Sequence, residues 1–194
     1  MRTAELQAPA VEPVTLTDAK RHLRIEDSDS DQDLDRKIRA ARRQVEGFLG
    51  RQLIQAKYTL FLDRFSKEIE LPFPPLVSID QIRYVDEAGA TQTLNPPFTI
   101  FATDINVEPG LLYLAYDQTL PSTRIQRNAV EIDFTCGYGA STDDVPEDIR
   151  LAIMHLAWHY DDIRGAAITE GGQPAKVPFA YEDLLWKYRM IANA

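Results

Sequence analysis

Several features that mark common protein classes are missing from this sequence. Cys136 is the only cysteine, so the chain forms no internal disulfide. No uncharged apolar run approaches the roughly 20 residues of a membrane span. The opening residues, MRTAELQAPAVEP, lack the apolar core of a signal peptide and the basic, acid-free character of a transit sequence. We therefore expect a soluble, cytosolic chain that does not bind a membrane.

Catalytic motifs are also missing. The sequence contains neither Gly-x-Ser-x-Gly nor a phosphate-binding glycine loop. His155 and His159 are four residues apart on a predicted helix, where two imidazoles can share a metal ion, and Asp162 follows. The metalloprotease pattern requires a glutamate directly after the first histidine, and this chain has Leu156 there. The sequence therefore predicts no catalytic residue, no metal and no cofactor, and a metal-dependent enzyme is the less favoured alternative.

Acidic charge is in surplus and unevenly placed. The chain has 21 basic and 30 acidic residues, which gives a net charge of −9. Residues 1–55 carry ten of each, residues 56–137 carry six basic and eleven acidic, and residues 138–194 carry five basic and nine acidic. Proteins that grip DNA by its phosphates depend on clustered lysine and arginine, so this balance argues against such binding.

The N-terminal quarter of the chain predicts two helices. Residues 14–25 begin near a plausible N-cap, Thr17, and residues 31–49 have one apolar face and end at Gly50. The other face of the second helix is basic, with Arg36, Arg39, Arg42 and Arg43. This face is either a surface for a partner's acids or phosphates or an ordinary solvated face. Acid-first pairs such as Asp33 with Lys37 favour the solvated alternative.

From residue 57 the pattern changes to short alternating segments that predict strands. They are YTLFL, EIELP, SIDQIRYVDEAGATQTL, FTIFA, LLYLAY and AVEIDFTCGYG. The third segment predicts a hairpin that turns at residues 87–89. Seven prolines between residues 72 and 121 suit edges and turns rather than central parallel strands.

The strongest helix signal covers residues 144–164, DVPEDIRLAIMHLAWHYDDIR. Asp144 suits the N-cap, with Glu147 as its capping-box partner. One apolar stripe contains Ile149, Ala152, Ile153, Leu156, Ala157, Tyr160 and Ile163. A second stripe on the opposite side contains Leu151, Met154 and Trp158. We expect the first stripe to face the core and the second to contact another element or to be a self-association surface.

The C-terminal part predicts a loop and a last helix. Residues 165–178 contain three glycines and two prolines without periodicity, which is typical of a mobile loop. In residues 179–194 one helix face contains Tyr181, Leu184, Leu185, Tyr188 and Ile191. Trp186 and Met190 project elsewhere, and an exposed tryptophan near a chain end usually packs against a partner or back onto the fold.

These segments predict an α+β fold in which N- and C-terminal helices pack as a small helical bundle with an inserted antiparallel β unit. The expected divisions are residues 1–55 for the N-terminal helices, 56–137 for the β unit and 138–194 for the C-terminal helices.

Three motifs appear in a fixed order along the chain. They are P-L-x-S-I-x-x-I-x-Y-x-D at residues 75–86, GYG followed by V-P-x-x-I-x-x-A-I at residues 137–153, and P-x-x-x-x-x-L-L-x-x-Y-R from residue 178. In this order the chain resembles the head-tail connector (adaptor, or head-completion) proteins of tailed double-stranded DNA bacteriophages, prophages and gene transfer agents. The resemblance spans residues 14–189. It departs from the family pattern at Leu120, where tryptophan is common, and at Lys187, where proline is common.

The resemblance implies a structural protein of the particle neck that is made in the host cytoplasm. It implies a ring of twelve subunits that docks on the portal protein, offers a platform for the next neck, stopper or tail component, and lets DNA pass through without specific binding. Candidate portal contacts are the loop at residues 165–178 and the terminal residues Trp186, Tyr188, Arg189 and Met190. Another neck or tail-completion protein of the same particle is the alternative.

Overall fold

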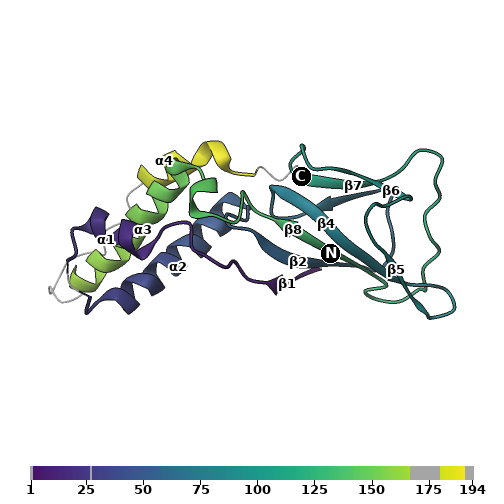
Figure 1. The fold of residues 1–194 in the computed structure, drawn as a ribbon, viewed down its shortest axis with the longest axis horizontal. Coiled ribbons are helices and arrows are strands. Elements are labelled where there is room, and N and C mark those ends of the chain that lie inside the picture. Colours follow the sequence, from purple (N-terminus) through teal and green to yellow (C-terminus); the bar gives the residue numbers. More distant parts are fainter. Residues whose placement is uncertain (1, 27, 167–179, 191–194) are drawn as a thin grey trace. The chain divides into compact units, whose positions relative to one another are not determined.

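The computed structural model describes residues 2–26, 28–166 and 180–190. The chain divides into two compact units, each drawn as a ribbon in Figure 1. The β unit consists of residues Met1–Ala10 and Gln55–Tyr138, and the helical unit consists of residues Val11–Ile54 and Gly139–Ala194. The chain is therefore of the α+β class, with antiparallel sheets in one unit and helices in the other.

The helical unit contains four α-helices and two short 3-10 helices within the described residues. Their bounds are α1 Leu16–Leu23, α2 Asp31–Leu49, η1 Thr142–Asp144, α3 Glu147–Ala166, α4 Ala180–Leu185 and η2 Trp186–Tyr188. Helix α3 packs against α2 and α4, and α1 contacts both α2 and α3. Five members of the first apolar stripe of α3 lie in the core as expected, since Ile149, Ala152, Ile153, Leu156 and Ala157 are all buried. Tyr160 is half-buried, and the side chain of Ile163 lies outside what the structure describes.

Three helix ends differ from the sequence predictions. Thr15, and not Thr17, caps α1, because its hydroxyl accepts the Asp18 N–H at 3.0 Å. Ser141 is the N-cap of η1, and Asp144 at the end of η1 accepts the Ser141 N–H at 2.8 Å. Asp144 is therefore not the N-cap of α3, which begins at Glu147. Of the single helix predicted for residues 179–194, the described residues 180–190 contain two elements, α4 and η2, and the remaining residues lie outside the described part. The predicted loop is partly wrong too, since α3 extends to residue 166, and residues 167–178 lie outside the described residues.

The β unit contains two antiparallel sheets. The strands are β1 Arg2–Gln7, β2 Ala56–Leu62, β3 Glu68–Leu71, β4 Leu76–Val85, β5 Thr91–Leu94, β6 Phe101–Asp104, β7 Gly110–Leu114 and β8 Val130–Cys136. The five-stranded sheet has the order β1-β2-β8-β4-β5, and the three-stranded sheet has the order β3-β7-β6. The β4–β5 hairpin turns at the predicted place, where Gly89 adopts a φ of 89° that favours glycine.

One core serves both sheets of the β unit. Strand β8 lies in the middle of the larger sheet, and its Ile132 and Phe134 side chains are completely buried. The same cluster includes Ile69 of β3, Phe101 of β6 and Leu112 of β7. Side chains from the two sheets thus exclude water from a shared interior, which is the main source of stability in a unit of this kind.

Strand β1 was not expected from the sequence. It pairs antiparallel with β2 from Arg2 opposite Phe61 to Gln7 opposite Lys57. Its side chains are mostly exposed, so the segment RTAELQ lacks the apolar alternation that identifies a half-buried strand. Hydrogen bonding to the edge of an existing sheet, rather than side-chain burial, places this segment in the β unit.

Candidate docking surfaces

The most exposed aromatic arrangement of the helical unit lies where η2 meets the end of α2. Trp186 is 64% exposed, and its ring centroid lies 6.3 Å from that of Phe48. The Arg189 guanidinium lies 5.1 Å from the centroids of both rings. We call Phe48, Trp186 and Arg189 the terminal platform. Cation–π contacts of this kind order an arginine without removing it from the surface.

Backbone and side-chain contacts hold the terminal platform in place. The Met190 N–H donates to the Leu49 carbonyl at 2.9 Å, and the Arg51 side chain donates to the Tyr188 carbonyl. The Lys187 ammonium lies 2.6 Å from the Asp148 carboxylate, and the Tyr188 hydroxyl donates to the same carboxylate at 3.2 Å. The hydrogen bond from Lys187 lowers the pKa of Asp148 below its ordinary value and raises the pKa of Lys187.

The terminal platform joins two of the four predicted portal contacts, Trp186 and Arg189, with Phe48, which the sequence did not single out. Trp186 and Arg189 are exposed, whereas Tyr188 and Met190 are half-buried against the helices. Phe48 was expected only as a member of the apolar face of α2, but it is half-buried and contacts Arg189. No local pattern marks Phe48 as a surface residue, because its partner lies about 140 residues later in the chain.

A second surface surrounds Trp158 on α3. Trp158 is 48% exposed, and a cavity of about 390 Å³ beside it is lined by His22, Leu23, Arg24, His155 and Trp158. The other two members of the predicted second stripe, Leu151 and Met154, are half-buried. Of the three residues in this stripe, only Trp158 is exposed to solvent.

The two histidines of α3 do not face one site. The His155 ring lies 5.8 Å from the His22 ring, and burial, followed by the electrostatic effect of His22, lowers the pKa of His155 below its ordinary value. His159 is only 3% exposed, and its Nε2 atom has no hydrogen-bond partner among the described residues. The side chain of Asp162 lies outside what the structure describes. Across residues 2–26, 28–166 and 180–190, no group of three or more potential ligands could hold a metal ion.

Arg42 does not belong to the exposed basic face of α2. It is only 7% exposed, and its guanidinium lies 2.7 Å from both the Glu12 and Glu46 carboxylates. The Glu46 carboxylate also accepts a hydrogen bond from the Gln52 side chain, and burial raises the pKa of Glu46. The sequence prediction failed here because Glu12 precedes the helices and reaches α2 only in the folded chain. Arg36, Arg39 and Arg43 are exposed as predicted.

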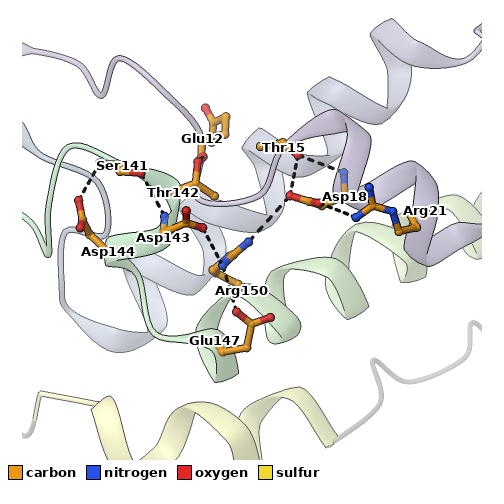
Figure 2. Close-up of polar contacts among 10 residues, drawn as sticks. All are labelled: Glu12, Thr15, Asp18, Arg21, Ser141, Thr142, Asp143, Asp144, Glu147 and Arg150. Atoms are coloured by element: carbon orange, nitrogen blue, oxygen red, sulfur yellow. Dashed lines mark hydrogen bonds and ion pairs between the residues drawn. The ribbon is translucent and has the colours of Figure 1, made fainter.

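A polar network fixes the start of α3 against the segment that leads into α1 (Figure 2). Arg150 reaches Glu147 at 3.0 Å, Asp143 at 3.4 Å and Asp18 at 3.9 Å. The Thr142 hydroxyl donates to the Glu12 carbonyl at 3.0 Å. The network joins residues about 130 positions apart, and the buried Arg150 Nε has no hydrogen-bond partner among the described residues. Because the Arg150 guanidinium is already paired with three carboxylates, the network is a structural feature rather than a ligand site.

These observations define an α+β protein whose distinctive exposed groups are aromatic and basic side chains. None of the helices in the described part of the chain is both long and apolar enough to cross a membrane. A search of curated proteins finds no match. The head completion protein family matches residues 12–180. The chain belongs to this family, as its sequence motifs indicated.

Solved structures with the same fold come from gene transfer agent (GTA) particles. A chain from the virion of a native GTA particle is 26% identical with a TM-score of 0.79, and a chain from the neck of an empty GTA particle computed with C6 symmetry is 26% identical with a TM-score of 0.78. A chain from the neck of a native GTA particle computed with C12 symmetry is 24% identical with a TM-score of 0.78. Each match covers 100% of this chain and 98% of the other.

Proposed function

We propose that this protein is a structural head-tail connector of a phage-like particle, located in the neck between the DNA-filled head and the tail. Membership of the head completion protein family supports this role, as does the match over the full chain to a subunit of a GTA particle neck. The protein acts by binding other proteins and has no catalytic activity. It is present in the host cytoplasm before it joins the particle.

The terminal platform is the proposed contact with the portal protein. Trp186 combines a large apolar ring with 64% exposure, and Arg189 is held against it. Tryptophan and arginine are the residue types that most often dominate the binding energy of protein interfaces. Because the platform is ordered by Phe48 and by the hydrogen bond from Met190 to Leu49, little conformational entropy is lost when a partner binds.

The Trp158 surface is the proposed contact between neighbouring subunits in a ring. A ring forms when two different surfaces of one chain meet head to tail and the rotation closes. Exposed Trp158 and the adjacent cavity provide an apolar surface for such a contact, while the opposite stripe of α3 is already used by the core. The ring of twelve subunits and its platform for the next neck, stopper or tail protein remain expectations from the family resemblance.

We further propose that the helices before and after the β unit act as one small bundle that carries the insertion. Packing of α3 against both α2 and α4 supports this arrangement. The acidic surplus of −9 suits a channel through which DNA moves without specific binding, because repulsion keeps phosphates away from the wall.

Co-purification with the portal protein of the same particle tests the proposal. We expect the wild-type chain to bind the portal, Trp186→Ala to weaken binding by about tenfold or more, and Arg36→Ala to leave it unchanged. Arg36 is a suitable control because it is an exposed residue of the same unit that does not belong to the terminal platform. Absence of portal binding by the wild-type chain would overturn the connector role. Full binding by Trp186→Ala would instead show that the portal contact lies elsewhere.

A further inference from the structure

Four arginines gather at one end of the β unit. Arg64, Arg124 and Arg127 line a cavity of about 740 Å³ together with Asp63 and Ile125. Arg127 and Asp63 also line a neighbouring cavity of about 320 Å³, which Arg2 and Phe61 complete. We call Arg2, Arg64, Arg124 and Arg127 the arginine cluster. The whole chain carries −9, so the rest of it carries −9 − 4 = −13.

Within the described part of the chain, no carboxylate forms an ion pair with any member of the arginine cluster. All four residues are exposed, and Arg2 lies 5.3 Å from the Phe61 ring centroid. Arg83 in the same unit shows the contrast, since it lies 2.7 Å from Asp133 and 2.9 Å from Glu131. Asp63 lines both cavities but does not pair with these arginines. Its carboxylate instead accepts the Asn128 N–H at 2.9 Å and so fixes the backbone there.

Figure 1 shows the long connection between β7 and β8. Arg124 and Arg127 belong to this connection, and hydrogen bonds hold its backbone at both ends of the arginine pair. The Arg124 N–H donates to the Val85 carbonyl at 3.0 Å, and Asn128 is held by Asp63. The Arg124 guanidinium lies over the β4–β5 turn, because a Cβ built on Gly89 would be 2.7 Å from its Nη1 atom. The cluster therefore has a defined position on the β unit.

Two apolar side chains on the same connection are completely exposed. Ile125 lies between the arginines with 103% relative exposure, and Tyr116 has 98%. Both are the kind of residue that becomes buried when a protein partner covers the surface. A phosphate backbone offers no apolar surface for Ile125, and a chain with a net charge of −9 repels DNA at long range. The surface therefore fits an acidic protein partner better than a nucleic acid.

The chain itself offers a complementary acidic surface. Strand β3 is an edge strand, and its Glu68 and Glu70 side chains are exposed on one face, about 7 Å apart along the strand. Within the described residues neither glutamate forms an ion pair. Their neighbours across β7 are Tyr113, which is 38% exposed, and Leu111, which is half-buried. This face of β3 and β7 thus combines two carboxylates with apolar surface, as the arginine cluster combines guanidinium groups with Ile125.

We propose that the arginine cluster of one copy binds Glu68 and Glu70 of a second copy, so that the β units make a head-to-tail contact between neighbouring subunits. This inference rests on the proposed function, because it assumes a ring. Two unlike surfaces on one chain are what a heterologous contact requires. Arginine fits the role because its planar guanidinium can hold a carboxylate through two hydrogen bonds.

Charge exchange between two variants of the full chain tests the contact. Variant A is Arg124→Glu with Arg127→Glu, and variant B is Glu68→Arg with Glu70→Arg. We expect the wild type to associate in sedimentation velocity at low salt and to dissociate as salt rises. Each variant alone should associate about tenfold or more weakly, and an equal mixture of A and B should recover the wild-type level because every contact again joins opposite charges.

The matched control is Arg36→Glu with Arg43→Glu, which makes the same charge change on two exposed arginines of α2. We expect its association to stay close to that of the wild type. A monomeric wild type at low salt, a mixture that does not recover, or a control as weak as variant A would overturn the contact. So would binding of a DNA duplex by the wild type that variant A loses while self-association is unchanged. Portal co-purification on the same samples separates the two proposals. If the wild type binds the portal but the charge exchange fails, only the contact between β units is wrong. If the wild type does not bind the portal, the connector role itself is wrong.

Discussion

The Lys187 ammonium lies 2.6 Å from the Asp148 carboxylate and so joins the last 3-10 turn to the first turn of α3. Both side chains are largely exposed, at 63% and 41%. An exposed ion pair gains little because water screens the charges and both long side chains lose freedom. We expect Lys187→Ala to lower the free energy of unfolding much less than Arg42→Ala lowers it, as measured by urea denaturation. A loss as large as that of Arg42→Ala would show that η2 depends on this pair for its position.

Arg42 should be far more sensitive than its neighbour Arg43. Removal of Arg42 leaves Glu12 and Glu46 facing each other in a partly buried site without their common cation. Breaking a buried ion pair in this way costs about 3–5 kcal/mol. We therefore expect Arg42→Ala to lower the free energy of unfolding by an amount in that range, and Arg43→Ala to change it by about 0.5 kcal/mol or less. Equal effects in urea denaturation would contradict the burial of Arg42.

Substitution by alanine should have opposite effects on stability at two glycines of the helical unit, Gly139 and Gly47. A Cβ on Gly139 would lie 2.0 Å from the Asp144 carboxylate oxygen that accepts the Ser141 N–H. Gly47 lies inside α2 with no atom within 4 Å of the corresponding position. We expect Gly139→Ala to destabilise by about 1–3 kcal/mol through loss of the cap. Gly47→Ala should stabilise by about 0.5–1 kcal/mol, because alanine favours a helix interior. Thermal denaturation should therefore give a lower melting temperature than the wild type for Gly139→Ala and a higher one for Gly47→Ala.

Protonation of His155 should lower the free energy of unfolding of the helical unit under mildly acidic conditions. Burial and His22 hold its pKa in the folded chain below the ordinary value of 6.5, so the unfolded chain binds more protons near and below that pH. Stability is therefore fully present above pH 6.5 and is lost as pH falls toward the folded pKa. We expect the free energy of unfolding to decrease as pH falls from about 7.5 to about 5.5, and to decrease less in His155→Gln.

His22→Gln is the companion variant for this pH dependence. It removes the second cause of the pKa shift but leaves the burial of His155, so its pH dependence should lie between those of the wild type and His155→Gln. Parallel curves for the wild type and His155→Gln would contradict the role of His155.

Much of the β unit was predictable because short-range patterns control it. Alternating segments separated by proline and glycine located seven of the eight strands, and the turn around Gly89 was correct. Strand β1 was missed because its stability comes from hydrogen bonds to β2 and not from a buried face of its own. The apolar stripe of α3 that includes Ile149 was predicted correctly for a similar reason, since a repeat of 3.6 residues is visible in the sequence itself.

The candidate surfaces were only partly predictable. Trp158 and Trp186 could be identified from the sequence because each is a large aromatic residue that lies off the core-facing stripe of its predicted helix, and both are exposed. Their neighbours did not stand out, because Phe48 meets Arg189 and His22 meets His155 across more than 100 residues of chain. The arginine cluster likewise assembles residues from position 2 to position 127.

The sequence by itself determined the class of the fold, the family and the positions of most helices and strands, because these depend on local periodicity and on motifs in a fixed order. Pairs within one helix, such as Asp33 with Lys37, were also visible in the sequence, but tertiary structure alone decided which charges far apart in the chain are paired. Arg42 became a buried partner of Glu12 and Glu46, while no carboxylate in the described part of the chain forms an ion pair with the arginine cluster. The physical reason is that an ion pair depends on distances of a few ångströms between side chains, and folding sets those distances between segments far apart in the chain.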